Sequence, residues 1–223
     1  MINIASYLDF ANHHPDATEA DIRELCQKVL EHGFNSAFVN QTYVKLARSV
    51  MGDKGKVGSI VAFPLGEELL ASKIAEAQDT ARAEADELDI SLNISLIKNK
   101  KWAESLEEMK QLTEAIKTIE PTKIVKFILE TGYLDEEEIK KTSQQIVESG
   151  ADFVKTNSGM GPRGARLEDV RVIREAIGSD FKIKVAGGIS TYEKAKAFIE
   201  SGANRIGTSK AVEILNEAKG DLG

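Results

Sequence analysis

Cysteine and histidine are scarce in this sequence. Cys26 is the single cysteine among 223 residues, which excludes an internal disulfide and a cysteine-rich metal site and suits a reducing compartment. Cys26 falls in the apolar pattern of a predicted helix, so we expect a core residue rather than a nucleophile. Two of the three histidines, His13 and His14, are adjacent, which suits a surface turn better than two ligands of one metal ion. The sequence therefore offers no convincing metal-ligand cluster.

Long apolar runs and an excess of positive charge are also missing. Nowhere are there about 18 consecutive apolar residues, the length that spans a membrane. The N-terminus, residues 1–5, lacks the basic region and the long apolar core of a signal peptide. The net charge of −7 and the lack of a basic cluster argue against a nucleic-acid or anionic-membrane partner. We therefore expect a soluble, cytoplasmic protein.

The remaining composition is that of an ordinary globular protein, with 42% apolar and 29% charged residues. A chain of 223 residues is long enough to bury a substantial core. No linker, low-complexity tract or shift in composition divides it. Residues 1–223 are therefore predicted to form a single domain.

Short apolar runs alternate with longer amphipathic ones along the whole chain, which predicts eight strand-helix pairs. The predicted strands are residues 4–9, 36–40, 56–63, 87–93, 123–130, 152–157, 182–186 and 204–208. The predicted helices are residues 18–32, 42–51, 69–85, 102–119, 135–149, 167–177, 192–201 and 210–218. Strict alternation favours a parallel sheet, and eight units favour an α/β fold closed into a (β/α)8 TIM barrel. An open, doubly wound sheet is the alternative.

Lys155 is the candidate for the chemistry. Residues 152–159 read as a buried strand that breaks into a glycine-rich turn, so Lys155 lies at the C-terminal end of a strand, where parallel α/β folds bind ligands. Burial disfavours the charged form of a lysine, so a dry pocket lowers its pKa and frees the amine as a nucleophile for Schiff-base chemistry. The alternative is a structural lysine that pairs with a carboxylate or reaches solvent.

Charged residues are expected on the interior face of the barrel, because alternate residues of a strand point to opposite faces. The apolar face of strands four to seven should pack against the helices. The opposite face has the polar and charged residues Glu87, Asp89, Ser91, Lys126, Glu130, Lys155, Lys182 and Lys184. Ionised groups inside a barrel cost free energy unless they are paired or used. We interpret them as a reaction site, because adjacent cations lower the pKa of an amine and a carboxylate can shuttle protons. A buried ion network without chemistry is the alternative.

Glycine-bearing loops follow the last three predicted strands. They contain residues 159–164, Gly187 with Gly188, and Gly207 with Ser209. Glycine lets backbone amides approach an anion closely, and helix N-termini add partial positive charge. A phosphorylated substrate is therefore predicted. Residues 159–164 also fit G-x-G-x-x-G, but that fingerprint belongs in the first turn of a doubly wound domain, so we do not expect a dinucleotide site.

Several segments together resemble the deoxyribose-phosphate aldolase family over nearly the whole chain. They are Asp86-Glu87-Leu88-Asp89 with Asn93-Ile94, Val125-Lys126-Phe127-Ile128-Leu129-Glu130-Thr131, Gly150-Ala151-Asp152-Phe153-Val154-Lys155-Thr156, Lys184-Val185-Ala186-Gly187-Gly188-Ile189 and Arg205-Ile206-Gly207-Thr208-Ser209. The resemblance implies a class I aldolase of carbohydrate catabolism that needs no cofactor. Such an enzyme joins acetaldehyde to glyceraldehyde 3-phosphate reversibly through a lysine Schiff base. The resemblance also implies a homo-oligomer, either a dimer or a tetramer.

The resemblance also implies a role for each site residue. Lys155 would form the Schiff base, Lys184 would lower its pKa, and Asp89 would take part in proton transfer through water. The phosphate of the substrate would lie against the backbone near Gly159 and against Gly187, Gly188, Gly207 and Ser209. Asp9 is retained from the family's pattern after the first strand and is expected among the substrate-binding residues.

Several positions depart from the family's pattern. Ala11 replaces a threonine that faces the substrate in the family, and His13 replaces an apolar neighbour. Phe38 replaces a cysteine associated with the family's pocket, and Lys210 follows the phosphate loop, where small or polar residues are common. The chain ends in Asp221-Leu222-Gly223, without the C-terminal tyrosine that some members use in proton transfer.

These departures leave two alternatives to deoxyribose-phosphate cleavage. One is a related Schiff-base aldolase that acts on a different phosphorylated sugar, because polar pockets discriminate strongly between substrates. The other, from a different functional class, is a barrel that binds a phosphorylated ligand without turnover.

Overall fold

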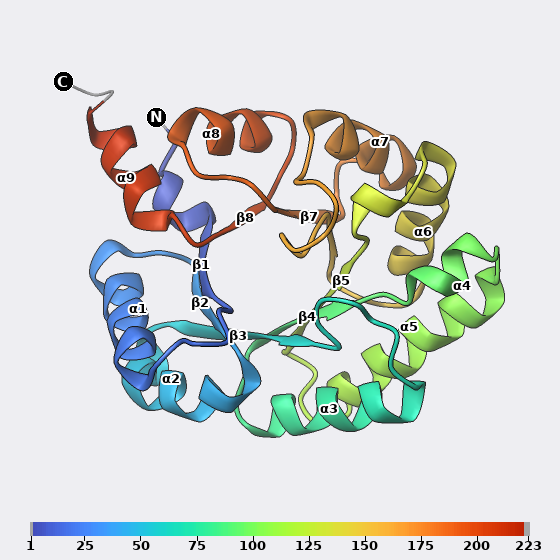
Figure 1. Ribbon diagram of the computed structural model, residues 1–223, viewed down its shortest axis with the longest axis horizontal. Coiled ribbons are helices and arrows are strands. Elements are labelled where there is room, and N and C mark those ends of the chain that lie inside the picture. The colour runs from blue at the N-terminus through green and yellow to red at the C-terminus, as the bar shows by residue number, and fades with distance from the viewer. Residues whose placement is uncertain (1, 221–223) are drawn as a thin grey trace.

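Parallel strands close into a barrel in the computed structural model, which describes residues 2–220 (Figure 1). Each strand pairs with the next along the chain, and β8 pairs with β1. The strands are β1 (Leu8–Asn12), β2 (Ser36–Val39), β3 (Lys56–Val61), β4 (Glu87–Ser91), β5 (Ile124–Ile128), β6 (Phe153–Lys155), β7 (Lys182–Ala186) and β8 (Arg205–Thr208). The predicted (β/α)8 barrel is confirmed, and the open sheet is excluded. The C-terminal Asp221-Leu222-Gly223 lies outside the described residues.

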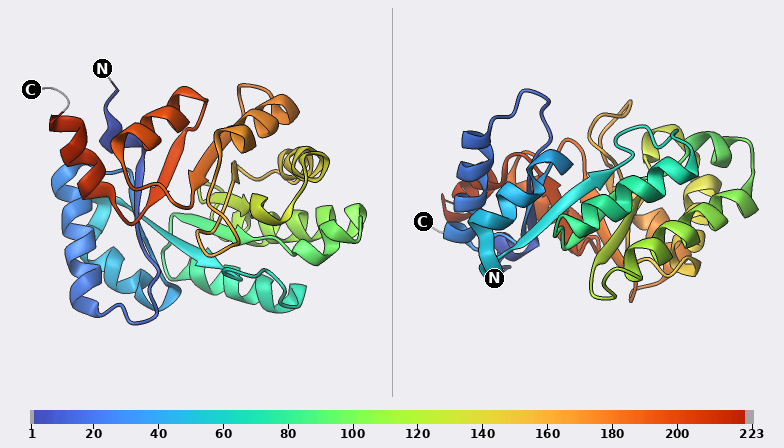
Figure 2. Two further views of the ribbon diagram at one scale, coloured as in Figure 1. Left: turned by 45° about the horizontal axis from the view of Figure 1, so that its top comes forward. Right: turned by 90° about the horizontal axis from the view of Figure 1, so that it is seen from below.

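Helices surround the barrel on its outer side, as Figures 1 and 2 show. The α-helices are α1 (Glu19–His32), α2 (Val44–Met51), α3 (Leu70–Arg82), α4 (Ile94–Lys98), α5 (Trp102–Lys117), α6 (Glu136–Glu148), α7 (Leu167–Ile177), α8 (Tyr192–Glu200) and α9 (Ala211–Gly220). Short 3-10 helices occupy Ile4–Tyr7, Gln41–Tyr43, Gly52–Lys54 and Thr131–Tyr133. Within residues 2–220, no helix is both long enough and apolar enough to cross a membrane.

Reciprocal side-chain caps fix the start of two helices. At α1, the backbone amide of Asp21 donates to the Thr18 hydroxyl at 3.3 Å, and the Thr18 amide donates to the Asp21 carboxylate at 2.8 Å. Asp135 and Glu138 form the same arrangement at α6. These bonds satisfy amides that the first turn of a helix leaves without partners. The helix starts predicted near residues 18 and 135 therefore agree with the structure.

The alternation along the strands separates an apolar layer from a charged interior, as predicted. Apolar residues such as Val125 and Phe127 of β5 and Ile183 of β7 are fully buried in the core. The interior residues Asp9, Glu87, Asp89, Lys126, Lys155 and Lys184 are at most 3% exposed. Lys182 does not belong to this group, because it is exposed at the start of β7. Cys26 also lies in the core, where burial raises the pKa of its thiol to about 11.

Two parts of the chain differ from the prediction. The strand expected at residues 4–9 begins only at Leu8, because the Ser6 amide and hydroxyl both donate to the Asn3 carbonyl and wind Ile4–Tyr7 into a 3-10 turn. Helix α4 was not predicted, because Asn93 reads as the end of β4. In the structure the Asn93 side chain accepts a hydrogen bond from the Leu96 amide at 3.1 Å and caps this short helix.

A buried ion pair fixes the loop after β3 to two helices. Lys73 of α3 is fully buried, and its Nζ lies 2.8 Å from Glu108 Oε1 of α5. The same nitrogen donates to the Gly66 carbonyl at 2.7 Å. Gly66 belongs to the loop that also contains Phe63, so this pair restrains a loop at the C-terminal end of the barrel.

Replacing Lys73 should therefore destabilise the protein. We expect Lys73→Met to lower the free energy of unfolding by about 3 kcal/mol, because the Glu108 carboxylate would stay buried without its partner. Lys45 of α2 is exposed, and Lys45→Met should change the same quantity by less than about 0.5 kcal/mol. Urea unfolding followed by far-UV circular dichroism measures both variants. Equal losses in the two variants would contradict the stabilising role of the pair.

Candidate active site

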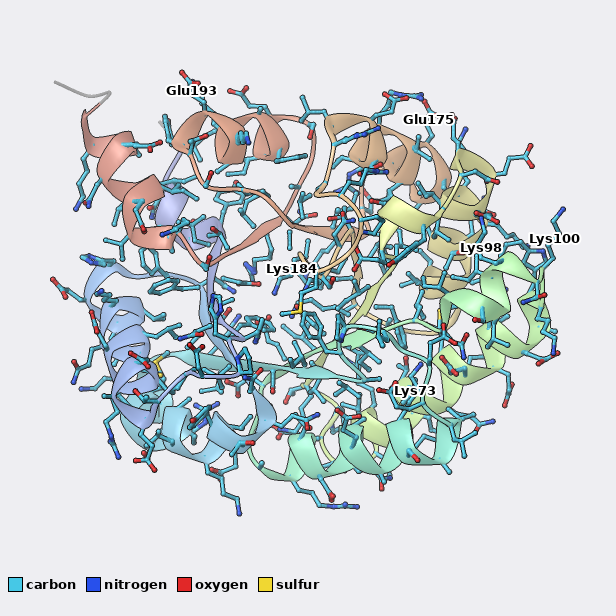
Figure 3. The ribbon with its side chains drawn as sticks, in the orientation of Figure 1. Lys73, Lys98, Lys100, Glu175, Lys184 and Glu193 are labelled. Atoms are coloured by element: carbon cyan, nitrogen blue, oxygen red, sulfur yellow. The ribbon has the colours of Figure 1, made fainter. Side chains whose placement is uncertain are left out.

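A cavity of about 520 Å³ opens at the C-terminal ends of the strands. Its walls include seven residues of the predicted site: Lys155, Lys184, Gly159, Gly187, Gly188, Gly207 and Ser209. Figure 3 shows Lys184 near the centre of the barrel. Asp9 and Asp89 are fully buried and do not line the cavity. We call this space the reaction cavity.

A cluster of charges lies at the base of the reaction cavity, around the carboxylate of Asp89. Asp89 Oδ2 lies 2.9 Å from Lys155 Nζ and 2.8 Å from Lys184 Nζ. Its Oδ1 lies 3.1 Å from Lys126 Nζ. Asp9 binds Lys184 from another side, with 2.7 Å between Oδ2 and Nζ. The strand register brings these groups together, because Asp89 lies beside Lys126 and Lys155 lies beside Lys184.

The same cluster sets the protonation of its members. Burial lowers the pKa of Lys155, the positive charges of Lys184 and Lys126 lower it further, and Asp89 opposes them without restoring the ordinary value of 10.5. Burial alone would raise the pKa of Asp89, but Lys126, Lys155 and Lys184 outweigh it and hold that pKa well below 3.8. Lys155 is thus the amine that becomes neutral most easily, beside a carboxylate that stays ionised.

Lys184 is surrounded differently from Lys155. It contacts the carboxylates of both Asp9 and Asp89, and its Nζ lies 3.3 Å from the centre of the Phe38 ring. A cation over an aromatic face is stabilised by the electrons of the ring. Lys155 contacts only Asp89 among the carboxylates of the described residues. The amine of Lys184 therefore has two carboxylates and an aromatic ring around it, whereas the amine of Lys155 has one carboxylate.

Lys126 and Glu87 belong to this cluster, although sequence reasoning did not include them in the site. Both side chains are fully buried, and Lys126 Nζ donates to Glu87 Oε2 at 2.5 Å. Although burial opposes it, the carboxylates of Asp89 and Glu87 raise the pKa of Lys126. Their position on the interior face was predicted from alternation, but their pairing depends on the register between β4 and β5.

Glycines at the C-terminal ends of the last three strands form part of the wall of the reaction cavity. Gly159, Gly187 and Gly188 have φ values of 91°, 98° and 75°, which residues other than glycine rarely adopt. The loops after β6 and β7 pack together through a bond from the Ala165 amide to the Gly187 carbonyl at 3.2 Å. Gly207 has a different reason to be glycine, because a Cβ there would lie 3.1 Å from Lys184 Cε.

Within the described residues, the four positions that depart from the family's pattern line the reaction cavity. Ala11 and His13 lie on the side of the first strand, and Phe38 follows on the second. Lys210 follows β8, and its Nζ forms a 2.9 Å ion pair with Glu213. The departures therefore concern residues that can meet a ligand. Among the described residues, no group of three or more His, Cys, Asp or Glu side chains could hold a metal ion.

A second cavity of about 320 Å³ adjoins the first and was not predicted. The two share Ser158 and Met160, which follow β6. Its walls are largely apolar, with Leu65, Leu92 and Ile128 among them. Because these residues come from three separate loops and strands, periodicity alone gave no signal for it.

A sequence model described as DeoC/LacD family aldolase matches residues 5–212. The chain belongs to this aldolase family. Its relatives include the deoxyribose-phosphate aldolase of Thermococcus kodakarensis, which is 44% identical over 220 residues and matched over 96% of each chain. The deoxyribose-phosphate aldolase of Caldanaerobacter subterraneus subsp. tengcongensis is 41% identical over 98% of this chain and 95% of that relative.

Solved structures agree with this membership. The aldolase QR15 superposes with a TM-score of 0.93 at 40% identity and covers 100% of this chain and 98% of its own. The deoxyribose phosphate aldolase from Aeropyrum pernix gives a TM-score of 0.90 at 29% identity, over 97% of this chain and 91% of its own. The resemblance inferred from the sequence motifs is confirmed, and the chain is an aldolase, a carbon-carbon lyase.

The charge cluster predicts that two variants of this aldolase shift the pH midpoint of Lys155 reactivity in opposite directions. Neutral amine increases with pH, so the rate at which Lys155 reacts with a small aldehyde should rise and level off with a midpoint below 10.5. Asp89→Asn removes the carboxylate that raises the pKa of Lys155, so the midpoint should move to lower pH. Lys184→Met removes a cation that lowers this pKa, so the midpoint should move to higher pH. Initial rates of adduct formation, trapped with cyanoborohydride and measured by intact mass, give each midpoint.

The two variants act as controls for each other, because each removes one charge from the same cluster. Circular dichroism confirms that both fold. Midpoints that move in the same direction would contradict the electrostatic explanation of the lowered pKa.

Proposed function

We propose that this aldolase reversibly cleaves 2-deoxy-D-ribose 5-phosphate to acetaldehyde and D-glyceraldehyde 3-phosphate through a Schiff base on Lys155. The observation that supports the chemistry is the position of Lys155 Nζ, which lies in the wall of the reaction cavity and 2.9 Å from Asp89. The names of the relatives support the substrate, because those from Thermococcus kodakarensis and Caldanaerobacter are deoxyribose-phosphate aldolases.

The reaction follows from the properties of an amine near a carboxylate. The neutral Lys155 attacks the aldehyde carbon of the open-chain sugar, and loss of water gives a protonated imine. The imine accepts the electron pair of the bond between C2 and C3, while the C3 hydroxyl loses its proton through water to the ionised Asp89. Glyceraldehyde 3-phosphate then leaves, and an enamine remains on Lys155. Protonation of the enamine and hydrolysis release acetaldehyde.

The neighbours of Lys155 have separate roles in this proposal. The ionised Asp89 stabilises the protonated imine and passes protons through water, because it is buried beneath the amine rather than exposed to the substrate. Lys184 lowers the pKa of Lys155 so that more of the amine is neutral. Asp9 is fully buried and acts on the substrate only through Lys184, with 2.7 Å between Asp9 Oδ2 and Lys184 Nζ.

The glycine wall is proposed to bind the phosphate. Backbone amides near Gly159, Gly187 and Gly188 and the hydroxyl of Ser209 border the same part of the reaction cavity. The N-terminus of α9, which begins at Ala211, lies directly after them and adds partial positive charge.

A related aldolase that acts on another phosphorylated sugar is the second candidate. Ala11, His13 and Phe38 line the cavity and change its size and polarity beside Lys155. Comparing kcat/KM over a panel of phosphorylated sugars separates the two candidates. A barrel that only binds its ligand would show no turnover with any member of the panel.

The proposed setting of this activity is the cytoplasm, and the proposed assembly is a homo-oligomer. The single cysteine supports the cytoplasm, because it suits a reducing compartment. The proposed phosphosugar substrate supports a role in carbohydrate catabolism. A dimer or tetramer is proposed because the relative from Aeropyrum pernix is a tetramer. Light scattering during size-exclusion chromatography measures the oligomeric state, and a monomer would contradict it.

Selective trapping tests the Schiff base directly. Cyanoborohydride with acetaldehyde, or with deoxyribose 5-phosphate, should label Lys155 alone, because the other buried amines of the cluster have better-stabilised charges. Lys155→Ala should abolish both the label and the release of glyceraldehyde 3-phosphate, whereas Lys45→Ala should retain both. Peptide mass mapping locates the label. Labelling that persists in Lys155→Ala, or that spreads over surface lysines, would contradict the proposal.

Two matched glycine variants test the phosphate wall. Gly188 and Gly178 have nearly equal φ values of 75° and 74°, and a Cβ at either would meet no atom closer than 4.0 Å. Each change to Ala should destabilise the protein by about 1 to 2 kcal/mol. Only Gly188→Ala should raise KM for deoxyribose 5-phosphate relative to unphosphorylated deoxyribose, because Gly178 ends α7 away from the cavity. Equal KM ratios for both variants would place the phosphate elsewhere.

A further inference from the structure

His13 is a polar residue in the reaction cavity for which the proposed mechanism has no role. It follows β1 and lines the cavity together with Lys155 and Phe63. Its ring centre lies 5.5 Å from that of Phe63, and Lys155 Nζ lies 5.8 Å from the same Phe63 ring. His13 and Lys155 therefore adjoin one aromatic side chain in the reaction cavity.

The imidazole of His13 has an unused hydrogen-bonding atom. Its Nδ1 is buried and has no hydrogen-bond partner among the described residues. A buried polar atom without a partner destabilises the protein, and a polar group of a bound ligand can offset this cost. A purely structural histidine would be expected to use this atom within the protein.

The ring is also neutral at working pH. Burial lowers the pKa of His13, the positive charges of Lys155 and Lys184 lower it further, and Asp89 and Asn40 oppose them, which leaves a pKa of about 3. A neutral imidazole has one nitrogen that donates and one that accepts, so it suits an oxygen that alternates between hydroxyl and carbonyl. It also avoids adding a third positive charge beside Lys155 and Lys184.

We propose that His13 hydrogen-bonds the oxygen on C3 of the sugar. This oxygen is a hydroxyl in the phosphosugar and becomes the aldehyde oxygen of glyceraldehyde 3-phosphate. This inference rests on the proposed function, because it takes Lys155 as the position of the imine. The bond polarises the aldehyde during synthesis and aligns the hydroxyl during cleavage, without a proton passing to the ring. His13 is thus a further catalytic residue, one that acts on bond cleavage and not on Schiff-base formation.

The two buried aspartates near the lysines are less suited than His13 to hydrogen-bond the substrate oxygen. Asp89 is fully buried, and its two oxygens are within 3.1 Å of three lysine nitrogens. Asp9 is buried beneath Lys184 and does not line the cavity. His13 differs from both, because it borders the cavity and its Nδ1 is unpaired.

The experiment separates bond cleavage from the steps before it. Three rates are measured for wild type, His13→Leu and His13→Gln. They are cyanoborohydride trapping of acetaldehyde on Lys155, exchange of the acetaldehyde methyl protons in D₂O, and release of glyceraldehyde 3-phosphate from deoxyribose 5-phosphate. Trapping and exchange involve the imine and the enamine but not the oxygen that His13 would bind. His32→Leu removes an imidazole from the end of α1 and is the matched control.

In His13→Leu, release of glyceraldehyde 3-phosphate should fall about 100-fold, while trapping and exchange keep their wild-type rates. His13→Gln should recover part of the loss, because its amide can still hydrogen-bond the oxygen. His13→Leu should also be at least as resistant to urea as wild type, because it removes an unpaired buried atom. His32→Leu should retain all three rates.

Three results would overturn the inference. The first is an unchanged rate of glyceraldehyde 3-phosphate release in His13→Leu. The second is an equal fall in the rates of trapping and release in a folded variant. The third is a release rate in His13→Gln no higher than in His13→Leu. Failure of the proposed function is distinguishable, because wild-type protein would then show neither selective trapping on Lys155 nor cleavage of deoxyribose 5-phosphate.

Discussion

The carboxylate of Asp89, shared by three buried lysines, is the interaction on which the site depends. Isolated charges inside a barrel are unstable, and each lysine of the cluster requires a nearby anion to remain there. Asp89 supplies that anion for Lys126, Lys155 and Lys184 at 2.8 to 3.1 Å. Asp89 is shared by three amines, so the other partners of each amine decide how well its positive charge is stabilised. The amine with the fewest other partners, Lys155, is the one whose pKa is lowered.

The remaining partners decide which amine that is. Lys126 has Glu87 in addition to Asp89, and Lys184 has Asp9 and the face of Phe38. Lys155 has only Asp89 among the described carboxylates, and it lies where the barrel opens. The strand positions of the surrounding charges therefore leave Lys155 with one carboxylate partner in the wall of the cavity. The Phe38 ring fits beside this cluster because Gly58 has no side chain, and the ring occupies the space that a Cβ at Gly58 would fill.

Much of this could be predicted from the sequence, because the signals were periodic. Alternation along β4 to β7 placed Asp89, Lys155 and Lys184 on one face, and the repeat of strands and helices predicted the closed barrel. The start of β1 and the helix α4 were missed because each depends on local hydrogen bonds, to the Asn3 carbonyl and to the Asn93 side chain. The family's motifs gave the expected roles, which geometry alone does not assign.

The rest depended on register and packing, which a single sequence does not specify. Asp9 was expected to bind substrate, but the structure places it beneath Lys184, outside the wall of the cavity. The pairing of Lys126 with Glu87 required the alignment of β4 with β5. The adjacency of His13, Phe63 and Lys155 joins the loops after β1 and β3 with the end of β6, so neither spacing nor periodicity could predict it.

The central claim is that the environment of Lys155 lowers the pKa of its amine. Titration of the lysine side-chain resonances by NMR, with Lys155 assigned by its loss in Lys155→Ala, measures this pKa without substrate. The account predicts a midpoint for Lys155 below 10.5, while Lys126 remains protonated throughout the same range. A Lys155 midpoint at or above that of an exposed lysine would contradict it.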